Sequence, residues 1–555
     1  MTEAANLTWG ATAGGGSGNW DLTASDWASG GTNDLVWTNS SSAFFAGAAG
    51  TVTLDSTNVI DANSLTFDVS GYTITGGTLD LVGTTPAIAG GVASLSDTVT
   101  SVITGTSGLN LGSTSGSHLN ITLGGANTYT GSTVLTAGVY LYINTLANTS
   151  APSSLGESGT IQLGSNGSTT QVYYTGTGGS TNALWTIGGN STATNIFNNG
   201  SGAISFTNTG DAAVATGAGT GVRNITLEGS NSGANSFGET INDINTGLGS
   251  ITNVIKTGTG TWALTGANTY SGGTTLSGGL LEIGNASALG TGTFSVTAGG
   301  TSFDNTTGGS ISISNPLTLS GGSVTFVGSS AMTVSGTTTL SGTGSSITVE
   351  SNSLTLSGPV VEQSGSTAGL AVSGAGTLWL TAANSYSGGT TIGGGMVKID
   401  GVGTLGASAG ALTLNGGGLD LGTTSQTVGA LSITAVPSSG NVIQNGSISA
   451  SSYSVSNTSG TAGITANLLD QGAGSTLSKS GAGTLLLTGN NSYSGGSTIS
   501  AGTVVIGSST ALGSGIITFN GATLTSEASG VNIANNALLD AATNVTTGSG
   551  DTLTL

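Results

Sequence analysis

The sequence contains no cysteine and only four basic residues, Arg223, Lys256, Lys398 and Lys479. Without cysteine the chain forms no disulfide and no thiolate metal site, which suits a protein that stays unlinked while it crosses an oxidising compartment. Against four basic residues stand 24 acidic ones, so the formal net charge is −20 at pH 7. This lack of positive charge excludes nucleic acids and anionic membranes as partners.

Long apolar runs and a signal peptide are also missing. Nowhere do 18 apolar residues follow one another, so this segment contains no membrane-spanning helix. The opening residues MTEAANLTWG lack the positive end and apolar core of an export signal. Because the sequence stops within the alternating stretch Thr552-Leu553-Thr554-Leu555, we expect it to be a fragment of a longer chain.

Groups for catalysis are scarce. His118 is the single histidine, so any imidazole-based triad or metal site would have to use it, and an ordinary exposed histidine is the favoured interpretation. The carboxylates of Asp55, Asp61 and Asp68 are spaced six and seven residues apart, which predicts successive corners and not a catalytic pair. We therefore expect no enzymatic activity, with a polysaccharide-active β-helix enzyme using Asp61 or Glu239 as an alternative.

Metal and cofactor motifs are equally weak. The stretch Gly416-Gly417-Gly418-Leu419-Asp420 partly resembles the nonapeptide of calcium-loaded β-rolls, but it does not recur, and a corner entering a strand explains it. No glycine-rich phosphate loop is followed by Gly-Lys-Ser/Thr. The sequence predicts no metal and no cofactor.

What the sequence does have is 101 glycines and a motif that occurs four times, near 117–147, 254–284, 370–400 and 477–507. Each copy contains an Asn-x-Tyr-x-Gly turn that we interpret as structural. The turn residues are Asn127, Tyr129 and Gly131; Asn268, Tyr270 and Gly272; Asn384, Tyr386 and Gly388; and Asn491, Tyr493 and Gly495. The copies are unequally spaced, so they must punctuate a finer repeat.

The finer repeat is about 22 residues long, within the usual range of a solenoid coil. Three apolar positions return with this period: Leu319 and Leu340, Val327 and Val349, and Val334 and Leu356. Short alternating segments between glycine corners predict an all-β, right-handed parallel β-helix with about three short strands per coil.

Within the copy at 370–400, we expect three short segments to form one coil, ending near Leu380, Ile392 and Ile399. Asn384 is expected either to take a left-handed corner or to cap neighbouring amides, and Tyr386 to cover a strand edge. Corner glycines are expected to adopt positive φ.

These four copies resemble the autotransporter-associated β-strand repeat, also called the passenger-associated transport repeat, of autotransporter passenger domains. The copy near Tyr129 departs from it, with Ser117-His118-Leu119 where the others carry Gly-x-Gly-Thr. The resemblance implies export across the outer membrane to the surface of a Gram-negative cell. It also implies an outer-membrane β-barrel translocator as partner, which this sequence does not contain.

The first 50 residues hold four of the seven tryptophans, Trp9, Trp20, Trp27 and Trp37. We interpret residues 1–50 as an aromatic cap on a β-helix that runs from 51 to 555, in preference to a carbohydrate platform. The region 150–250, which contains Tyr173, is the least regular, and longer corner loops are expected there, where a binding site is easily grafted.

Together these features favour a non-enzymatic cell-surface passenger that acts as an adhesin stalk or rigid spacer. The alternative from another class is a self-associating extracellular fibre or biofilm matrix protein, since a charged fraction of 5% makes lateral contact feasible. Self-association and a host or surface glycan are the partners we consider.

Overall fold

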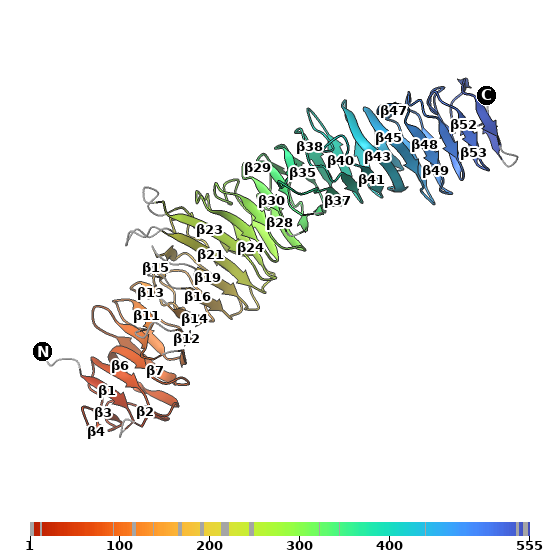
Figure 1. Cartoon of the computed structure of the whole chain (residues 1–555). Helices are drawn as coiled ribbons and strands as arrows, with labels where there is room; N and C mark the ends of the chain where they lie inside the picture. Colours follow the sequence, from red (N-terminus) through yellow and green to blue (C-terminus); the bar gives the residue numbers. More distant parts are fainter. Residues whose placement is uncertain are drawn as a thin grey trace. The chain divides into compact units, whose positions relative to one another are not determined.

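The structure is a computed structural model that describes residues 5–10, 14–92, 94–113, 118–136, 138–164, 169–188, 194–212, 221–243, 249–320, 322–342, 344–438, 440–539, 543–547 and 553–554. The chain forms two compact units, Met1–Gly292 and Thr293–Leu555. Within the described residues, every extended regular element is a β-strand and there is no helix (Figure 1). None of these residues therefore belongs to a helix that is long and apolar enough to cross a membrane. The prediction of an all-β fold is confirmed.

The strands of the first unit are β1 (Asn6–Trp9), β2 (Gly18–Trp20), β3 (Trp27–Ser29), β4 (Thr32–Leu35), β5 (Ser41–Phe45), β6 (Thr51–Phe67), β7 (Thr73–Leu81), β8 (Ala87–Gly90), β9 (Leu95–Val99), β10 (Val102–Thr104), β11 (Leu109–Ser113), β12 (Leu119–Leu123), β13 (Thr133–Leu135), β14 (Val139–Ile143), β15 (Thr160–Leu163), β16 (Thr170–Tyr174), β17 (Gly179–Thr181), β18 (Leu184–Ile187), β19 (Thr194–Asn198), β20 (Ile204–Phe206), β21 (Val222–Gly229), β22 (Asn235–Phe237), β23 (Ile251–Lys256), β24 (Thr261–Leu264), β25 (Gly273–Leu276) and β26 (Leu280–Ile283).

The strands of the second unit are β27 (Phe294–Val296), β28 (Thr301–Asn305), β29 (Ile311–Ile313), β30 (Leu317–Leu319), β31 (Ser323–Phe326), β32 (Met332–Val334), β33 (Thr338–Leu340), β34 (Ser345–Val349), β35 (Ser353–Leu356), β36 (Val360–Glu362), β37 (Leu370–Gly374), β38 (Thr377–Leu380), β39 (Thr390–Ile392), β40 (Met396–Ile399), β41 (Leu412–Asn415), β42 (Gly418–Asp420), β43 (Ser425–Ala435), β44 (Asn441–Gln444), β45 (Ser447–Val455), β46 (Thr461–Ile464), β47 (Asn467–Asp470), β48 (Thr476–Lys479), β49 (Thr484–Leu487), β50 (Ser497–Ile499), β51 (Thr503–Ile506), β52 (Ile517–Phe519), β53 (Thr523–Ser526), β54 (Val531–Asn532), β55 (Ala537–Leu539), β56 (Asn544–Thr547) and β57 (Leu553–Thr554).

In the second unit, strands stack in parallel on the strands of the preceding coil. One side is built by β27, β30, β33 and β36, a second by β28, β31, β34 and β37, and the third by β29, β32, β35 and β38. Chain order visits the three sides in turn, so each of these coils contains three strands. The prediction of a parallel solenoid with three strands per coil is confirmed here.

Two of the three predicted register pairs are correct, since Leu319 pairs with Leu340 and Val334 with Leu356. The third pair is wrong by one residue, because Val349 pairs with Phe326 and not with Val327. A one-residue step moves a side chain to the other face of a strand. Phe326 is accordingly the residue buried in the core.

The first unit has the same architecture. One side runs through β9, β12, β14, β16, β19, β21, β23 and β25, and another through β5, β6, β8, β11, β13, β15 and β18. The third side is formed by β17, β20, β22, β24 and β26. Figure 1 shows β14, β16, β19, β21 and β23 side by side. A long connection lies at the start of the region 150–250, as expected, since residues 144–159 separate β14 from β15. The described strands β15 to β22 nevertheless continue the coils, and Tyr173 lies in β16 and not in a loop.

The core runs along the inside of each unit because strand positions alternate between buried and partly exposed. In β35, β38 and β40, the inward pairs Leu354 and Leu356, Leu378 and Leu380, and Val397 and Ile399 are buried on top of one another. Each inward residue therefore contacts apolar residues of the coils before and after it. The stability of one coil depends on its neighbours.

The repeat motif interrupts this three-strand pattern. β38 and β40 are register partners, with Leu378 beside Val397, so the three segments near Leu380, Ile392 and Ile399 do not form one coil as expected. Each of these coils instead has two strands, β37 with β38 and then β39 with β40. The third side is occupied by turns, first at 382–388 and then at 402–409. The Asn-x-Tyr-x-Gly segment thus replaces a strand.

At the N-terminal end of the first unit, the four tryptophans form one buried cluster. The ring centroids of Trp27 lie 5.1 Å from Trp9, 4.9 Å from Trp20 and 4.6 Å from Trp37, and Phe45 joins them. β1 pairs in parallel with β5 and antiparallel with β3, which pairs antiparallel with β4. The β3–β4 hairpin therefore covers the strand edge of the first coil. Because the rings are buried, they offer no platform on which a sugar could stack.

We expect Trp27→Ala to destabilise the N-terminal coils by about 3 to 5 kcal/mol, because it leaves a cavity among four aromatic rings. The exposed coil end should also increase aggregation. Thermal unfolding and sedimentation measure both effects. Trp379→Ala is the matched control, since Trp379 is half-buried on an outer face. Equal losses in the two variants would contradict a capping role for residues 1–50.

Candidate functional site

The asparagine of each repeat copy is a buried side chain that joins three successive coils. Its Oδ1 accepts a hydrogen bond from a backbone N–H of the preceding coil, and its Nδ2 donates to a backbone carbonyl of the following coil. In the third copy Asn384 Oδ1 lies 2.8 Å from the nitrogen of Val360, and its Nδ2 lies 2.6 Å from the oxygen of Thr404. The other copies repeat the arrangement, with Asn127 between Ile103 and Ser154, Asn268 between Ile241 and Ala288, and Asn491 between Leu468 and Ala511.

Of the two alternatives for this asparagine, the left-handed corner is wrong. None of the four asparagines is among the residues with positive φ. The side chain instead bonds to backbone groups that the turn would otherwise leave without partners, because no strand is present there to pair with them. The structural role that we assign to the turn residues stays a prediction, which these hydrogen bonds to backbone groups support.

The repeat tyrosines lie inside the core and do not cover a strand edge as expected. Tyr129, Tyr270, Tyr386 and Tyr493 are at most 1% exposed. Each hydroxyl bonds to the Thr or Ser four residues later, as Tyr386 does to Thr390 at 2.7 Å. The hydroxyl of this Thr or Ser donates in turn to a leucine carbonyl of the next coil. In the third copy, Thr390 donates to the carbonyl of Leu405. Burial raises the pKa of all four phenols, so they remain neutral hydrogen-bonding groups.

A Leu-Gly pair in the coil after each copy completes the arrangement, and sequence reasoning missed it. In the third copy Gly406 has φ +90°, and a Cβ atom there would lie 2.6 Å from the oxygen of Tyr386 and 2.7 Å from its ring. Only glycine fits against the ring at this position. The corresponding glycines are Gly156, Gly290 and Gly513. The sequence signal is a Leu-Gly pair that returns at a fixed distance after the asparagine in three copies. The asparagine bonds to the residue two positions before this glycine. That residue lies 20 positions after the asparagine in three copies and 27 positions after it in the first.

The glycines of the turn itself serve a different purpose from the one expected. Gly131, Gly272, Gly388 and Gly495 do not have positive φ. A Cβ atom at Gly388 would lie 2.6 Å from the backbone nitrogen of Gly369 in the preceding coil. These glycines are therefore needed for close approach of two backbones.

An acidic side chain in the coil before each of the three well-matched copies binds the turn from outside. Glu362 Oε2 accepts from the backbone N–H and the hydroxyl of Ser387, at 3.1 and 2.8 Å. Asp470 does the same for Ser494, and Asp243 accepts from the N–H of Ser271. These hydrogen bonds lower the pKa of Glu362. These three acidic side chains thus accept hydrogen bonds from backbone amides of the turns.

We expect Asn384→Ala to destabilise the coils around it by about 2 to 5 kcal/mol, because the N–H of Val360 and the carbonyl of Thr404 lose their partner inside the core. Limited proteolysis should cut between 360 and 406 before global unfolding. Ser385→Ala is the control, since Ser385 is adjacent and exposed. Unchanged protease resistance in Asn384→Ala would show that the asparagine does not hold the coils together.

Two of the four basic residues are buried in the core at the same place in the repeat, 14 positions before the tyrosine. The ammonium of Lys256 donates to the carbonyls of Thr257, Gly258 and Gly278, at 2.8, 3.1 and 2.9 Å. Lys479 makes the same kind of contact with Gly481 and Ala501. Burial lowers the pKa of Lys256 to about 8. These lysines bind carbonyls of two coils and are not available to anionic ligands.

Glu239 is a buried carboxyl group in the first unit. Its Oε1 accepts from the backbone N–H of Trp185 at 3.4 Å, while Oε2 has no hydrogen-bond partner among the described residues. Burial raises its pKa to about 7, and backbone hydrogen bonds only partly oppose this. A group with such a pKa binds its proton more tightly in the folded than in the unfolded chain.

We expect the contribution of protonated Glu239 to the free energy of unfolding to be fully present below about pH 4.5. It should be lost as the pH rises to about 7, and the loss should be on the order of 3 kcal/mol. Glu239→Gln imitates the protonated acid and should abolish this loss. The melting temperatures of both proteins between pH 4.5 and 8 provide the test, with equal values expected at the acidic end. Parallel curves would refute the assignment.

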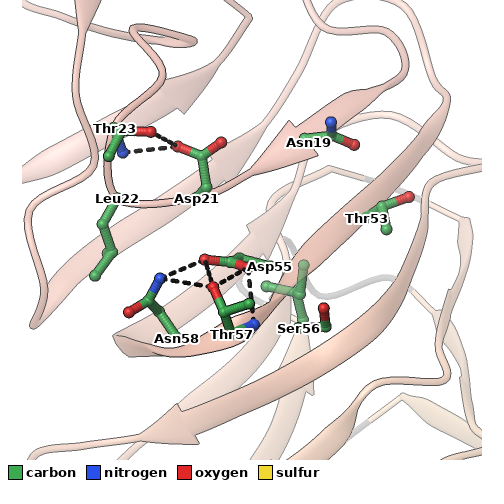
Figure 2. Close-up of a pocket in the computed structure, with 10 residues that line it drawn as sticks. Asn19, Asp21, Leu22, Thr23, Thr53, Asp55, Ser56, Thr57 and Asn58 are labelled. Carbon is green, nitrogen blue, oxygen red and sulfur yellow. Dashed lines mark hydrogen bonds between the residues drawn. The ribbon is translucent and has the colours of Figure 1, made fainter.

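A pocket of about 480 Å³ lies among residues 19–23 and 53–58, and Figure 2 shows the side chains that line it. Asp21 and Asp55 lie on neighbouring coils, since Trp20 pairs with Leu54, and each carboxylate accepts hydrogen bonds from its own turn. These bonds lower the pKa of both groups. A general acid is favoured by a pKa raised towards neutrality, and the pKa values of both groups are shifted the other way.

The other carboxylates considered from the sequence are not brought together. Asp55 belongs to the turn just described, Asp61 lies within β6 beside Asp80, and Asp68 follows the end of β6. Burial and the neighbouring Asp80 raise the pKa of Asp61. No group of three or more His, Asp or Glu in the described part of the chain is placed to hold a metal ion. Gly416 and Gly417 form the corner that leads into β42. Asp420 lies at the end of this strand, 3.8 Å from Lys398.

His118 is exposed and stacks on Tyr140, with ring centroids 4.6 Å apart. Ser117, with which the weakened first copy begins, lies outside the described residues. Tyr140 belongs to an aromatic strip on the outer face of the first unit, which we define as Tyr140, Tyr142, Tyr173 and Phe197. Sequence reasoning missed this strip, although alternation in β14, β16 and β19 was a signal that these residues face outward.

Four segments of the chain, 121–139, 254–283, 370–399 and 477–506, match the passenger-associated-transport-repeat family. The chain is also 40% identical over 169 residues to a protein of Brucella suis biovar 1 (strain 1330) named "Adhesin BmaC autotransporter". That alignment covers 30% of this chain and 5% of the relative. No solved structure matches.

Proposed function

We propose, from the premise that this chain is an autotransporter passenger segment with passenger-associated transport repeats, that it acts at the bacterial surface as a non-enzymatic adhesin stalk or spacer. The observation that carries the proposal is the connection of three coils, made by one buried asparagine and repeated in four places. Such connections stiffen a stack whose coils otherwise contact only their nearest neighbours. The relative named as an adhesin supports the same role.

Export and the translocator belong to this proposal. Passenger-associated transport repeats imply secretion to the cell surface, and a passenger of this kind requires an outer-membrane β-barrel as its partner. The chain suits such a route because it has no cysteine and gains each coil by adding it to the preceding one. Each repeat copy would hold together the newly added coils around it, because its asparagine bonds to the coil before it and to the coil after it.

The absence of a catalytic role is also a proposal. The carboxylates considered from the sequence are dispersed, and the pair in the pocket has lowered pKa values. Burial raises the pKa of four other carboxyl groups, those of Asp61, Asp97, Glu228 and Glu239. Of these, Asp97 accepts hydrogen bonds from the backbone N–H groups of Gly71 and Tyr72, as a structural carboxylate does. A screen for release of reducing ends from plant and bacterial glycans addresses the enzyme alternative directly. Activity that disappears in Asp61→Asn or Glu239→Gln would overturn the non-enzymatic assignment.

The test of the proposed function is bacterial surface display of the full-length protein that contains this passenger. We expect the passenger to be accessible to external protease and attachment to surfaces to increase several-fold over cells with an empty vector. A version without the translocator should lose both properties. Attachment that does not change while the passenger is displayed would exclude an adhesive role and leave that of a spacer.

Light scattering by the purified chain distinguishes a stalk or spacer from the alternative, a self-associating fibre or matrix protein. Because the net charge of −20 opposes contact at low salt, side-by-side association should appear only when salt screens it. We expect the protein to stay monomeric at high salt and high concentration. Salt-induced growth of the particles would favour the matrix protein.

A further inference from the structure

The aromatic strip stands out because the outer face elsewhere carries mainly small polar side chains. Among the phenylalanines, tyrosines and tryptophans that the structure describes, six side chains are partly exposed, and four of them are Tyr140, Tyr142, Tyr173 and Phe197. The remaining two, Phe44 and Trp379, lie on other strands, β5 and β38. A cluster of this kind on an otherwise polar face marks a contact surface.

Register places the strip on three adjacent strands. Tyr142, Tyr173 and Phe197 are direct partners in β14, β16 and β19, and their rings stack with centroids 4.6 and 4.4 Å apart and planes within 11°. Both faces of the Tyr173 ring are covered by its neighbours, whereas Tyr142 and Phe197 each have one face against Tyr173 and the other towards Thr122 and Glu228. Tyr140 lies two residues before Tyr142 and is stacked by His118.

Three amide side chains and Tyr140 form a second outward column beside the stack. Asn120, Tyr140, Gln171 and Asn195 are register partners on β12, β14, β16 and β19. The Tyr173 hydroxyl donates to Oε1 of Gln171, so the two columns are connected. Aromatic edges beside amides and hydroxyls offer both apolar contact and hydrogen bonds to one ligand.

The charge and size of the strip select its ligand. Glu228 is the charged residue in the same outward column, one coil after Phe197. The nearby Lys256 is buried with its ammonium on backbone carbonyls, so its charge is not offered to an anionic ligand. The exposed His118 stacks on Tyr140. Its three strands, spaced about 4.8 Å apart, make the strip about 10 Å long, and two columns make it about 7 Å wide. This area is far below the roughly 800 Å² that each partner of a stable protein complex buries.

We propose that the aromatic strip binds a short stretch of a neutral glycan that lies across β14, β16 and β19. The chain of sugars contacts the ring edges with its apolar C–H surfaces and the tyrosine hydroxyls and amides with its hydroxyl groups. Glu228 disfavours sulfated and carboxylated sugars at one end. This site provides the proposed adhesive function with a contact surface and rests on that function.

The purified chain is tested on immobilised β-linked hexasaccharides of glucose, galactose and N-acetylglucosamine, with a sulfated glycan for comparison. We expect retention on at least one neutral glycan and none on the sulfated one. The double variant Tyr142→Thr/Tyr173→Thr introduces the residue found at the same outward position in β12, Thr122, and should weaken retention at least ten-fold. Trp379→Thr, a partly exposed aromatic on the other unit, should bind as the wild type does.

Because the stack also supports the sheet, Tyr173→Phe is the second variant. It keeps the ring and removes the hydroxyl, so its melting temperature should be unchanged while retention falls three-fold or more. A wild-type chain that retains no neutral glycan, or strip variants that bind as well as the wild type, would overturn the inference. Retention of a purified protein by the strip, with none of any glycan, would assign the surface to a protein partner and also overturn it.

Attachment by bacteria that display the full-length protein separates this inference from the adhesive function. If displayed wild-type protein promotes attachment and the strip variants do so equally, the adhesive function stands and the glycan site is wrong. If wild-type display promotes no attachment although the purified chain binds a neutral glycan, the glycan site stands and the adhesive function is wrong.

Discussion

The structure depends on one constraint: each coil must satisfy its buried backbone groups through the coils on either side. Where three strands are present, parallel pairing does this. Where the chain gives up a strand for a turn, a single amide side chain does it instead, because asparagine carries both an acceptor and a donor on one short group. Asn384 thus replaces on one side of the coil what a strand would provide by backbone pairing.

The remaining parts of the repeat follow from this substitution. A turn that enters the core brings backbones close together, so Gly388 has no room for a Cβ atom. The ring of Tyr386 fills the space that strand side chains would occupy, and Gly406 of the next coil lies against it. Glu362 of the preceding coil then satisfies the outward amide of Ser387. Residues from three coils are needed for one turn, which explains why the motif is longer than a coil.

Much of the fold was predictable from the sequence because alternation and period report directly on inward and outward positions. Leu319 with Leu340 and Val334 with Leu356 were placed correctly by spacing alone. Val327 was misplaced because Phe326 and Val327 are both apolar, and spacing does not reveal which of two adjacent apolar residues faces inward. The family resemblance of the four copies was confirmed by the matching repeat family.

The roles within the motif were harder to predict because they involve partners about 20 residues away. Asn384 and Tyr386 were identified as turn residues, but neither the burial of the tyrosine nor its contact with Gly406 follows from residues 384–388 alone. Lys256 and Lys479 appeared to be ordinary basic residues until their common position before the tyrosine was related to the carbonyls of the next coil. Contacts between coils are visible in a sequence only when the same offset recurs, as it does for the Leu-Gly pair.

This division between inward and outward positions also explains where function can be placed. Inward positions and repeat turns are constrained by three coils at once, so a substitution there changes the stack itself. Outward positions in a parallel strand are constrained mainly by their two register neighbours, and most here are Thr, Ser or Asn. The aromatic strip occupies such positions, which is why Tyr142, Tyr173 and Phe197 can serve a ligand without altering the core beneath them. A solenoid of this kind acquires a binding surface by changing a few outward residues on consecutive coils, while its repeats preserve the scaffold.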